Sequence, residues 1–332
     1  INKGDFRFNV GAIYNYNRNK LDELPNADQY LYSSYWGSSS LVPTNDYMFV
    51  EGKAIGLVRG FISEGYYTVD DFNYTNGQYV LKEGVPDITK ALTATYMHPY
   101  DLPAGQTAFP GAAKFRDVDE SGTVDLDDAT CLGEVMPRHT GSFQLNFNYK
   151  NFDLSTNFNW TAGGKVYNVA AMINASGQEF DGIGAQRASW VADAFKVYNV
   201  NAAGDLYAVT NPDELRALNA NAKYHLPYHQ SGITSSEWLE NGSYLRLQTL
   251  TLGYTLPKNW LTKVHVDKIR LYLTATNLFT ITGYSGIDPE VNANPTGQSG
   301  FYSDLRIFPT LNMDFGTYPR ARTFTFGANI TF

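Results

Sequence analysis

Several segments of the chain alternate apolar and polar residues, and the segment 322–332 shows this pattern most clearly. Phenylalanine, alanine and isoleucine occupy every second position from Phe324 to Phe332, with threonine, glycine and asparagine between them. Successive side chains of a β-strand point to opposite faces. The segment therefore predicts a strand with one apolar face and one polar, uncharged face.

Five further segments alternate in the same way and predict strands of the same kind. They are residues 6–16, 142–149, 152–160, 244–256 and 269–279. The second and third are joined by Lys150 and Asn151, which predicts a long hairpin with a tight turn. In the fourth, the leucines change phase by one residue, which predicts a β-bulge near Gln248 or Thr249.

The connections between these segments alternate between short turns and long loops. One long excursion runs from Gly163 to Gly242 and predicts one short helix, with Asn211 as N-cap and Pro212 in the first turn. A second long loop runs from Ile281 to Pro319. Short turns at one end and long loops at the other are typical of outer-membrane β-barrels, and such long loops usually carry function.

Composition narrows the class of protein without deciding it. The chain has 332 residues and a mean hydropathy of -0.32, and no run approaches the roughly 18 apolar residues of a membrane-spanning helix. Aromatic residues make up 15% of the chain, which fits either the aromatic girdles of a barrel or a tyrosine-rich soluble sandwich or lectin. The polar face of the predicted hairpin, residues 142–149 and 152–160, is rich in Asn, Gln and Ser rather than Lys and Glu, which favours a hydrated lumen.

Charge and reactive residues exclude several functions. The net charge of -8 and the absence of a basic run argue against nucleic acid as a partner. A single cysteine, Cys131, precludes an internal disulfide and is interpreted as packed. His225 and His229 are four residues apart, but Pro227 between them disfavours a shared helical face and a zinc site. No G-x-S-x-G or H-E-x-x-H pattern supports an enzyme, and no signal peptide precedes the first strand.

The most chemically specific motif is the acidic segment 117–128. Its oxygen-bearing residues fall at positions 1, 3, 5, 7, 9 and 12 of a calcium-binding loop, with Gly122 at the turn. They are Asp117, Asp119, Ser121, Thr123 (through its carbonyl), Asp125 and Asp128. Since Asp128 stands where such loops usually have Glu, the segment is either a structural calcium site or a solvated acidic turn.

Aromatic residues in the predicted loops are candidate contacts for a substrate or for a partner protein that covers the barrel. Tyr30, Tyr35 and Trp36 cluster in the loop 26–45, while Trp190 and Trp238 lie on the long excursion. Flat, amphipathic rings can stack on a sugar ring or pack on a protein. The alternative is that these rings pack on one another.

Four runs together resemble the SusC/RagA-like TonB-dependent transporters of Bacteroidota outer membranes. These runs are residues 114–168, 243–261, 269–292 and 318–332. The last also resembles the terminal strand signal of outer-membrane barrels, with Thr325, Gly327, Ile330 and Phe332 at the matching positions. Before residue 114 the resemblance is loose, chiefly through the run EGKAIG.

The resemblance implies an antiparallel transmembrane barrel of roughly 22 strands, closed by a plug and surrounded by outer-membrane lipid. It implies import of oligosaccharides or peptides, a SusD-like surface lipoprotein as lid, and energy from TonB. The chain has only about eight to ten recognisable strands and no plug or TonB-interacting segment. We therefore interpret residues 1–332 as the carboxy-terminal part of one barrel domain, either a fragment or one piece of a split polypeptide. Residues 117–128 would be an insertion in an extracellular loop.

Two other classes remain open from the sequence. A self-contained small outer-membrane barrel could act as an enzyme or adhesin, and a soluble β-sandwich could bind carbohydrate. Detergent dependence would separate the sandwich from the two membrane proteins. An amino-terminal plug partner would separate the transporter from the small barrel.

Overall fold

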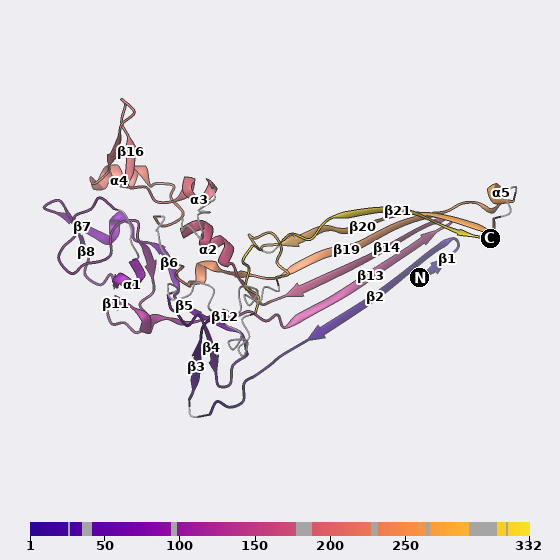
Figure 1. Cartoon of the computed structure of the whole chain (residues 1–332), viewed down its shortest axis with the longest axis horizontal. Coiled ribbons are helices and arrows are strands. Elements are labelled where there is room, and N and C mark those ends of the chain that lie inside the picture. The colour runs from indigo at the N-terminus through magenta and orange to yellow at the C-terminus, as the bar shows by residue number, and fades with distance from the viewer. Residues whose placement is uncertain are drawn as a thin grey trace, which may run out of the picture.

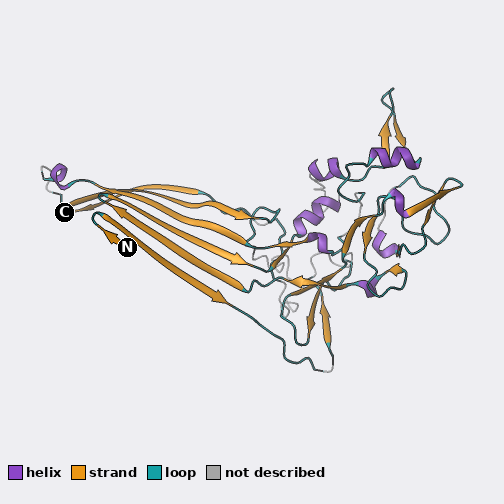
Figure 2. Cartoon of the chain, turned by 180° about the vertical axis from the view of Figure 1, so that it is seen from behind, coloured by secondary structure: helices purple, strands orange, loops and turns teal. Residues whose placement is uncertain are grey.

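The computed structural model describes residues 1–25, 27–34, 42–93, 98–176, 188–226, 232–262, 266–291, 311–316 and 318–332. Two parts are evident in Figure 1: a long antiparallel sheet, and a loop region built on one end of its strands. Both chain termini lie at the opposite end of the sheet. We call that end the turn end and the other the loop end. Seen from behind in Figure 2, the helices lie in the loop region, apart from one short helix at the turn end.

One seven-stranded sheet contains all the long strands of the described residues. In spatial order they are β1 (Asn2–Lys3), β2 (Phe6–Tyr16), β13 (His139–Tyr149), β14 (Phe152–Ala162), β19 (Tyr244–Thr255), β20 (Lys268–Thr282) and β21 (Thr323–Thr331). Every neighbouring pair is antiparallel. The six strands predicted from alternation are confirmed as β2, β13, β14, β19, β20 and β21.

The register gives the sheet two chemically distinct faces. Residues that pair directly across neighbouring strands point to the same face. One row across the six long strands is entirely apolar: Phe8, Phe147, Leu154, Leu252, Leu273 and Phe326. The next row is entirely neutral and polar: Asn9, Asn146, Ser155, Thr251, Thr274 and Thr325. The alternation seen in each segment thus adds up to one apolar face and one polar face.

A β-bulge keeps the two faces aligned near the loop end. The register between β19 and β20 shifts between Leu247 and Thr249, where the sequence predicts the bulge. The pairing with β14 shifts at the same level, between Asn157 and Phe158. Without the extra residue, the leucines of one half of β19 would point to the polar face, because a shift of one residue reverses every side chain.

The described sheet has seven strands rather than the eight to ten expected. The shorter β segments between residues 29 and 134 do not join it and instead pair among themselves in the loop region. The largest group is a four-stranded sheet made of β12 (Thr130–Glu134), β5 (Leu57–Gly60), β4 (Tyr47–Val50) and β3 (Gln29–Tyr32). These strands have four or five residues each, about half the roughly nine to eleven that cross a bilayer.

Five two-stranded ladders complete the β structure of the loop region. They are β6 (Ser63–Tyr66) with β10 (Ala113–Phe115), β7 (Phe72–Thr75) with β8 (Gln78–Leu81), β9 (Asp87–Ile88) with β11 (Thr123–Val124), β15 (Lys165–Tyr167) with β18 (Leu239–Asn241), and β16 (Tyr198–Val200) with β17 (Leu206–Ala208). The β7–β8 hairpin turns at Asn76 and Gly77, which both have positive φ.

The described helices are short. They are α1 (Lys90–Thr93), α2 (Val169–Ser176), α3 (Ala188–Asp193), α4 (Pro212–Leu218) and α5 (Lys258–Leu261), with single 3₁₀ turns η2 (Val69–Asp71), η3 (Leu126–Asp128) and η4 (Ser236–Trp238). The prediction of α4 is confirmed, and Asn211 Oδ1 accepts hydrogen bonds from the Asp213 and Glu214 amides. None of these helices is long and apolar enough to cross a membrane.

Two parts of the loop region differ from the sequence prediction. Residues 26–45, expected as loop, contain the strand β3, which pairs with β4. The excursion 163–242, expected to hold one helix, also holds α2 and α3 in its described part. Their sequences give weak local signals, because helices of eight and six residues are too short to show a long amphipathic stripe and are held instead by burial in a tertiary core, through side chains such as Met172 and Trp190.

The described residues form two large hydrophobic cores and one small cluster of Val166, Tyr284 and Val291 in the loop region, and each draws on distant parts of the sequence. The first joins Phe61 and Phe109 with Leu215 and Ile233. The second joins residues from Tyr32 to Met313, among them Tyr47, Tyr167, Met172, Trp190 and Trp238. By contrast, Leu252, Leu273 and Phe326 on the apolar face of the sheet remain 43–73% exposed. Within the residues that the structure describes, no second sheet covers the apolar face, as it would in a β-sandwich.

Candidate functional site

The polar face of the sheet is the broadest candidate site, because it offers neutral hydrogen-bonding groups across all six long strands. Ser155 Oγ donates to Asn146 Oδ1 at 2.6 Å, and Asn159 Nδ2 donates to Gln248 Oε1 at 2.5 Å. Asn157 Oδ1 is buried and accepts no hydrogen bond within the described residues. Such a face can exchange hydrogen bonds with a hydrated polar solute.

An ion pair marks the turn end of the polar face. Arg270 on β20 reaches across β19 to Asp153 on β14, with Nε 2.9 Å from Oδ1 and Nη2 bonded to Oδ2. Gly253 on β19 leaves the space for this pair, since a Cβ there would lie 2.4 Å from Arg270 Nη2. A cavity of 360 Å³ adjoins the pair and is also lined by Lys150 and Lys268.

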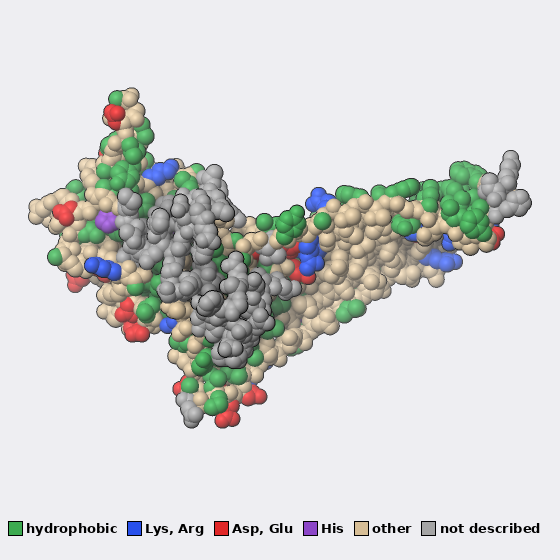
Figure 3. All heavy atoms as spheres, viewed as in Figure 1, with side chains coloured by type: hydrophobic (Ala, Val, Ile, Leu, Met, Phe, Trp, Pro, Cys, Tyr) green, Lys and Arg blue, Asp and Glu red, His purple; other side chains and the backbone are tan. Residues whose placement is uncertain are grey.

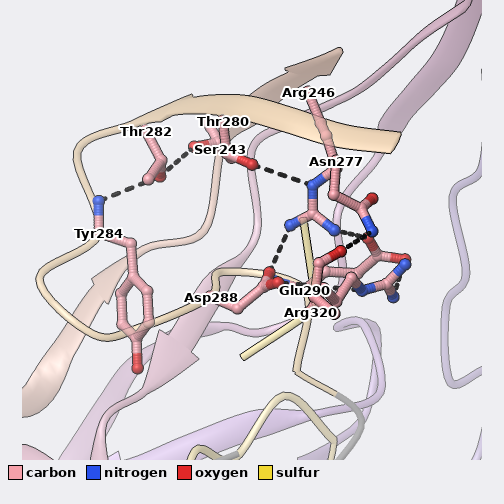
Figure 4. A network of polar contacts seen from close by, with 10 residues as sticks. Ser243, Arg246, Asn277, Thr280, Thr282, Tyr284, Asp288, Glu290 and Arg320 are labelled. Atoms are coloured by element: carbon pink, nitrogen blue, oxygen red, sulfur yellow. Dashed lines mark hydrogen bonds and ion pairs between the residues drawn. The ribbon is translucent and has the colours of Figure 1, made fainter. Parts of the chain in front are cut away.

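A network of four charged residues, of which Arg246 and Asp288 are buried, marks the loop end, where β19 and β20 enter the loop region (Figure 4). Arg246 is 2% exposed; its Nη2 lies 2.5 Å from Asp288 Oδ1 and its Nη1 lies 3.1 Å from Glu290 Oε2. Its Nε donates to Thr280 Oγ1 at 3.0 Å. Arg320 contacts both acids from the other side, at 2.8 Å from Glu290 and 3.8 Å from Asp288.

Further polar contacts hold the same stretch, residues 283–291, against the loop region. Tyr284 Oη donates to Asp314 Oδ2 at 2.6 Å, and the Ser285 amide donates to Glu240 Oε2 at 2.7 Å. Asn168 Nδ2 donates to the other Glu240 oxygen at 2.7 Å. Residues 283–291 therefore connect the sheet to the loop region through side chains from both parts.

Sequence reasoning missed the Arg246 network, although one signal pointed to it. Arg246 is the one charged residue in the polar phase of the predicted strand 244–256, where every other polar residue is neutral. A lone charge on such a face needs partners, because burying it unpaired is costly. Its partners are 42 and 44 residues further along the chain, so local patterns could not identify them.

The acidic loop 117–128 gathers three carboxylates, from Asp117, Asp119 and Asp128, whose oxygens lie within 4.8 Å of one another. Asp117 accepts hydrogen bonds from the Ser121 and Gly122 amides, and Gly122 takes a positive φ at the turn, as the calcium-loop spacing requires. Hydrogen bonds from Ser121 hold the pKa of Asp119 below its usual value. No lysine or arginine of the described residues forms an ion pair with these three acids.

The other predicted ligands of this loop have different roles in the structure. Asp125 caps the 3₁₀ turn η3 by accepting from the Asp127 amide at 2.8 Å, and it does not join the cluster of three. Thr123 accepts from Ser121 Oγ through its carbonyl. Asp128 is fully buried and accepts from the Val118 and Asp125 amides. The three gathered carboxylates fit a hard divalent cation, which prefers oxygen ligands.

The aromatic candidates have different environments. Tyr30 lies on β3, opposite Phe49 of β4, and is 46% exposed. Tyr35 and Trp36 lie outside the described residues. Trp190 and Trp238 are buried in the second core with their ring centroids 6.4 Å apart, so little of either indole can contact a ligand.

His225 is buried beside Trp190, and its environment does not suggest zinc. Its Nδ1 lies 2.8 Å from the Leu226 carbonyl and its Nε2 lies 4.0 Å from Glu237 Oε2. Burial lowers the pKa of His225 to about 4 and raises the pKa of Glu237 to about 7. His229 lies outside the described residues. Burial thus favours the uncharged form of both side chains.

No protein-family model matches the chain, but its similarity to curated proteins extends over its whole length. It is 28% identical over 333 residues to TonB-dependent receptor P3 of Formosa agariphila, covering all of this chain and 27% of that receptor. It is 26% identical over 246 residues to TonB-dependent receptor SusC of Bacteroides thetaiotaomicron, covering 71% of this chain and 19% of SusC. The chain thus spans about a quarter of the length of these relatives.

The fold is similar to part of a solved structure, that of the RagAB peptide transporter. The TM-score is 0.61 at 19% identity, and the match covers all of this chain and 28% of that one. The homologues of this chain are therefore TonB-dependent receptors, which are receptors and transporters rather than enzymes. More particularly, the chain is similar in sequence to SusC and in fold to part of the RagAB structure, and its partial coverage of these relatives is consistent with the carboxy-terminal portion expected from the sequence.

Proposed function

We propose that this chain forms part of the barrel wall of an outer-membrane importer that takes up oligosaccharides or peptides. The observation that carries the proposal is the pair of adjacent rows across six strands, one entirely apolar and the other entirely neutral and polar. Such a wall fits a bilayer on one side and a hydrated lumen on the other. In this function the chain catalyses no reaction; it forms part of the wall that lines the lumen through which the solute passes.

The remaining parts of the importer lie outside this chain. A plug and the other barrel strands would come from the amino-terminal part of the same receptor, TonB would act through that part, and a SusD-like lipoprotein would close the loop end. The similarity to SusC and to the structure of the RagAB peptide transporter supports these partners. Substrate or lid contact would involve the loop containing Tyr30, Tyr35 and Trp36.

Affinity purification in mild detergent tests the proposal. Outer membranes are extracted, the tagged chain is purified, and every co-purifying protein is identified by intact mass. We expect a plug-bearing receptor polypeptide, or one longer chain containing this sequence, together with a lipoprotein. A lone heat-modifiable barrel of 37 kDa would contradict the proposal and favour the self-contained small barrel.

A second experiment tests the contact residues. Substrate uptake is measured in a strain in which Tyr30, Tyr35 and Trp36 are all replaced by Ala, and assembly of the barrel is measured as the control.

We also propose that the acidic loop holds one structural calcium ion through Asp117, Asp119 and Asp128. The ion would offset the repulsion of the three clustered carboxylates and stiffen the loop, which adjoins the first core through Val124. Inductively coupled plasma mass spectrometry of the purified receptor should find one calcium fewer per chain in the Asp117→Ala, Asp119→Ala double variant. A calcium content that matches the parent protein would contradict this proposal. Asp127→Ala, outside the cluster, is the matched control.

A further inference from the structure

The charged residues of the chain are distributed unequally between the two ends of the sheet. We define the turn-end segments as residues 1–8, 147–156, 252–262, 266–271 and 327–332, which hold the described short connections and the strand ends beside them. The acidic residues in these segments are Asp5, Asp153 and Asp267. The basic residues are Lys3, Arg7, Lys150, Lys258, Lys268 and Arg270. The turn end is therefore basic, although the chain as a whole has a net charge of -8.

Three of these lysines lie where the apolar face of the sheet ends. Lys3 pairs with Phe6, so it belongs to the apolar face. Lys150 is the first residue of the β13–β14 turn, and its Nζ lies 5.5 Å from the centre of the Tyr149 ring. Lys258 begins α5, two residues before Trp260. All three lysines are exposed, and no carboxylate of the described residues forms an ion pair with them.

Exposed aromatic rings lie beside these lysines. Tyr149 and Phe152, which pair across the hairpin, are each 53% exposed, and Trp260 is 63% exposed. Hydrophobic and basic side chains both gather at this end of the molecule in Figure 3. Rings of this kind prefer the level of lipid headgroups, and a lysine beside them can extend its stem along the apolar surface and place its ammonium group among the headgroups.

We propose that the turn end binds the headgroups of anionic phospholipids through Lys3, Lys150 and Lys258. This inference rests on the proposed function, because it needs the apolar face to lie in a bilayer. The excess of basic side chains at the turn end indicates that the bound group is anionic. The exposed aromatic rings beside the three lysines indicate that this group is a lipid headgroup in the membrane. Lys268 and Arg270 contribute less, because both belong to the polar face and Arg270 is paired with Asp153.

Native mass spectrometry of the detergent-purified receptor complex tests the proposal. The probes are phosphatidylglycerol and phosphatidylcholine with the same acyl chains. The test variant is Lys3→Gln, Lys150→Gln, Lys258→Gln. The matched control neutralises three lysines of the loop region, Lys20, Lys53 and Lys196. Since a lysine near an anionic surface contributes about fivefold in affinity, the test variant should bind phosphatidylglycerol at least tenfold more weakly, with phosphatidylcholine binding unchanged. The control should bind both lipids as the parent protein does.

Three results would overturn the proposal: unchanged phosphatidylglycerol binding in the test variant, an equal loss for both lipids, or displacement of the lipid by millimolar inorganic phosphate. A variant with Arg at the three positions keeps the charge and should retain binding, which separates a charge effect from misfolding. Co-purification of the lipoprotein is scored on the same samples. If the lipoprotein does not co-purify with the parent protein, the proposed function is contradicted. If the lipoprotein co-purifies but the parent protein shows no preference for phosphatidylglycerol, only this inference is contradicted.

Discussion

Replacing Arg246 by Met should release residues 283–291 from the sheet. Arg246 is buried and donates to Asp288, Glu290 and Thr280. A methionine fills a similar volume but leaves the buried Asp288 carboxylate with only the more distant Arg320 as a cationic partner, at 3.8 Å. The uncompensated charge raises the free energy of the closed arrangement, so this stretch should open while the strands remain paired.

The expected magnitude follows from the burial of the pair. Removing one partner of a buried ion pair costs about 3–5 kcal/mol. An exposed pair is worth about 1 kcal/mol or less. Arg216, half exposed and bonded to Asp70 and Asp213, therefore provides the matched control. Arg216→Met should have little effect anywhere in the molecule.

Hydrogen exchange measured by mass spectrometry reports this opening directly. A loss of about 3–5 kcal/mol in the local opening free energy accelerates exchange by roughly two to three and a half orders of magnitude. The amides of Tyr284 and Glu290 should show it, since they donate to Thr282 Oγ1 and Asp288 Oδ1. If Arg246→Met and Arg216→Met exchange equally in residues 283–291, the network does not hold this stretch and the reasoning is refuted.

Two further predictions concern the loop region and the sheet. Burial raises the pKa of Asp46 to about 7, so folding takes up a proton between about pH 4 and 7. The contribution of the protonated Asp46 carboxyl to the free energy of unfolding is complete below about pH 4 and is lost as the pH rises through 7. Asp46→Asn should abolish that dependence in melting scans, and an unchanged slope would contradict the assignment. Gly253→Ala should displace the Arg270–Asp153 pair and lower the free energy of unfolding by about 1–3 kcal/mol. The measurement is the midpoint temperature of heat modifiability, which should fall. Gly11→Ala, with open space around its Cβ, should be neutral.

The sheet was predictable from the sequence because the residues that define each strand lie within one short segment of the chain. Each strand from Phe6–Tyr16 to Thr323–Thr331 carries its own alternation, and the bulge near Thr249 shows as a phase change within one segment. In a membrane barrel, contact of one face with the bilayer imposes such a pattern on each strand independently of its neighbours. The short helix at Pro212–Leu218 was predictable for the same reason, since Asn211 and Pro212 act within one turn.

The contacts of the loop region were not predictable in this way. In the sequence, Trp190 and Trp238 resemble loop aromatics that contact ligands. In the structure they pack near each other in a core assembled from several excursions. The partners of Arg246 likewise come from a later loop. The spacing of the acidic loop correctly indicated that Asp117, Asp119 and Asp128 lie together, but it could not show that Asp125 caps a 3₁₀ turn.

The cores of the loop region have a consequence for the order in which the molecule is assembled. The Phe61 amide donates to the Thr234 carbonyl, and the Tyr167 amide donates to the Asn312 carbonyl. Each contact joins excursions separated by at least one complete pair of long strands, so closing it is slow and entropically costly. The second core can therefore be completed only after residues 311–316, from the last excursion, have joined it. Until then its apolar side chains, among them Tyr47 and Tyr167, lack part of their packing and stay accessible to other molecules.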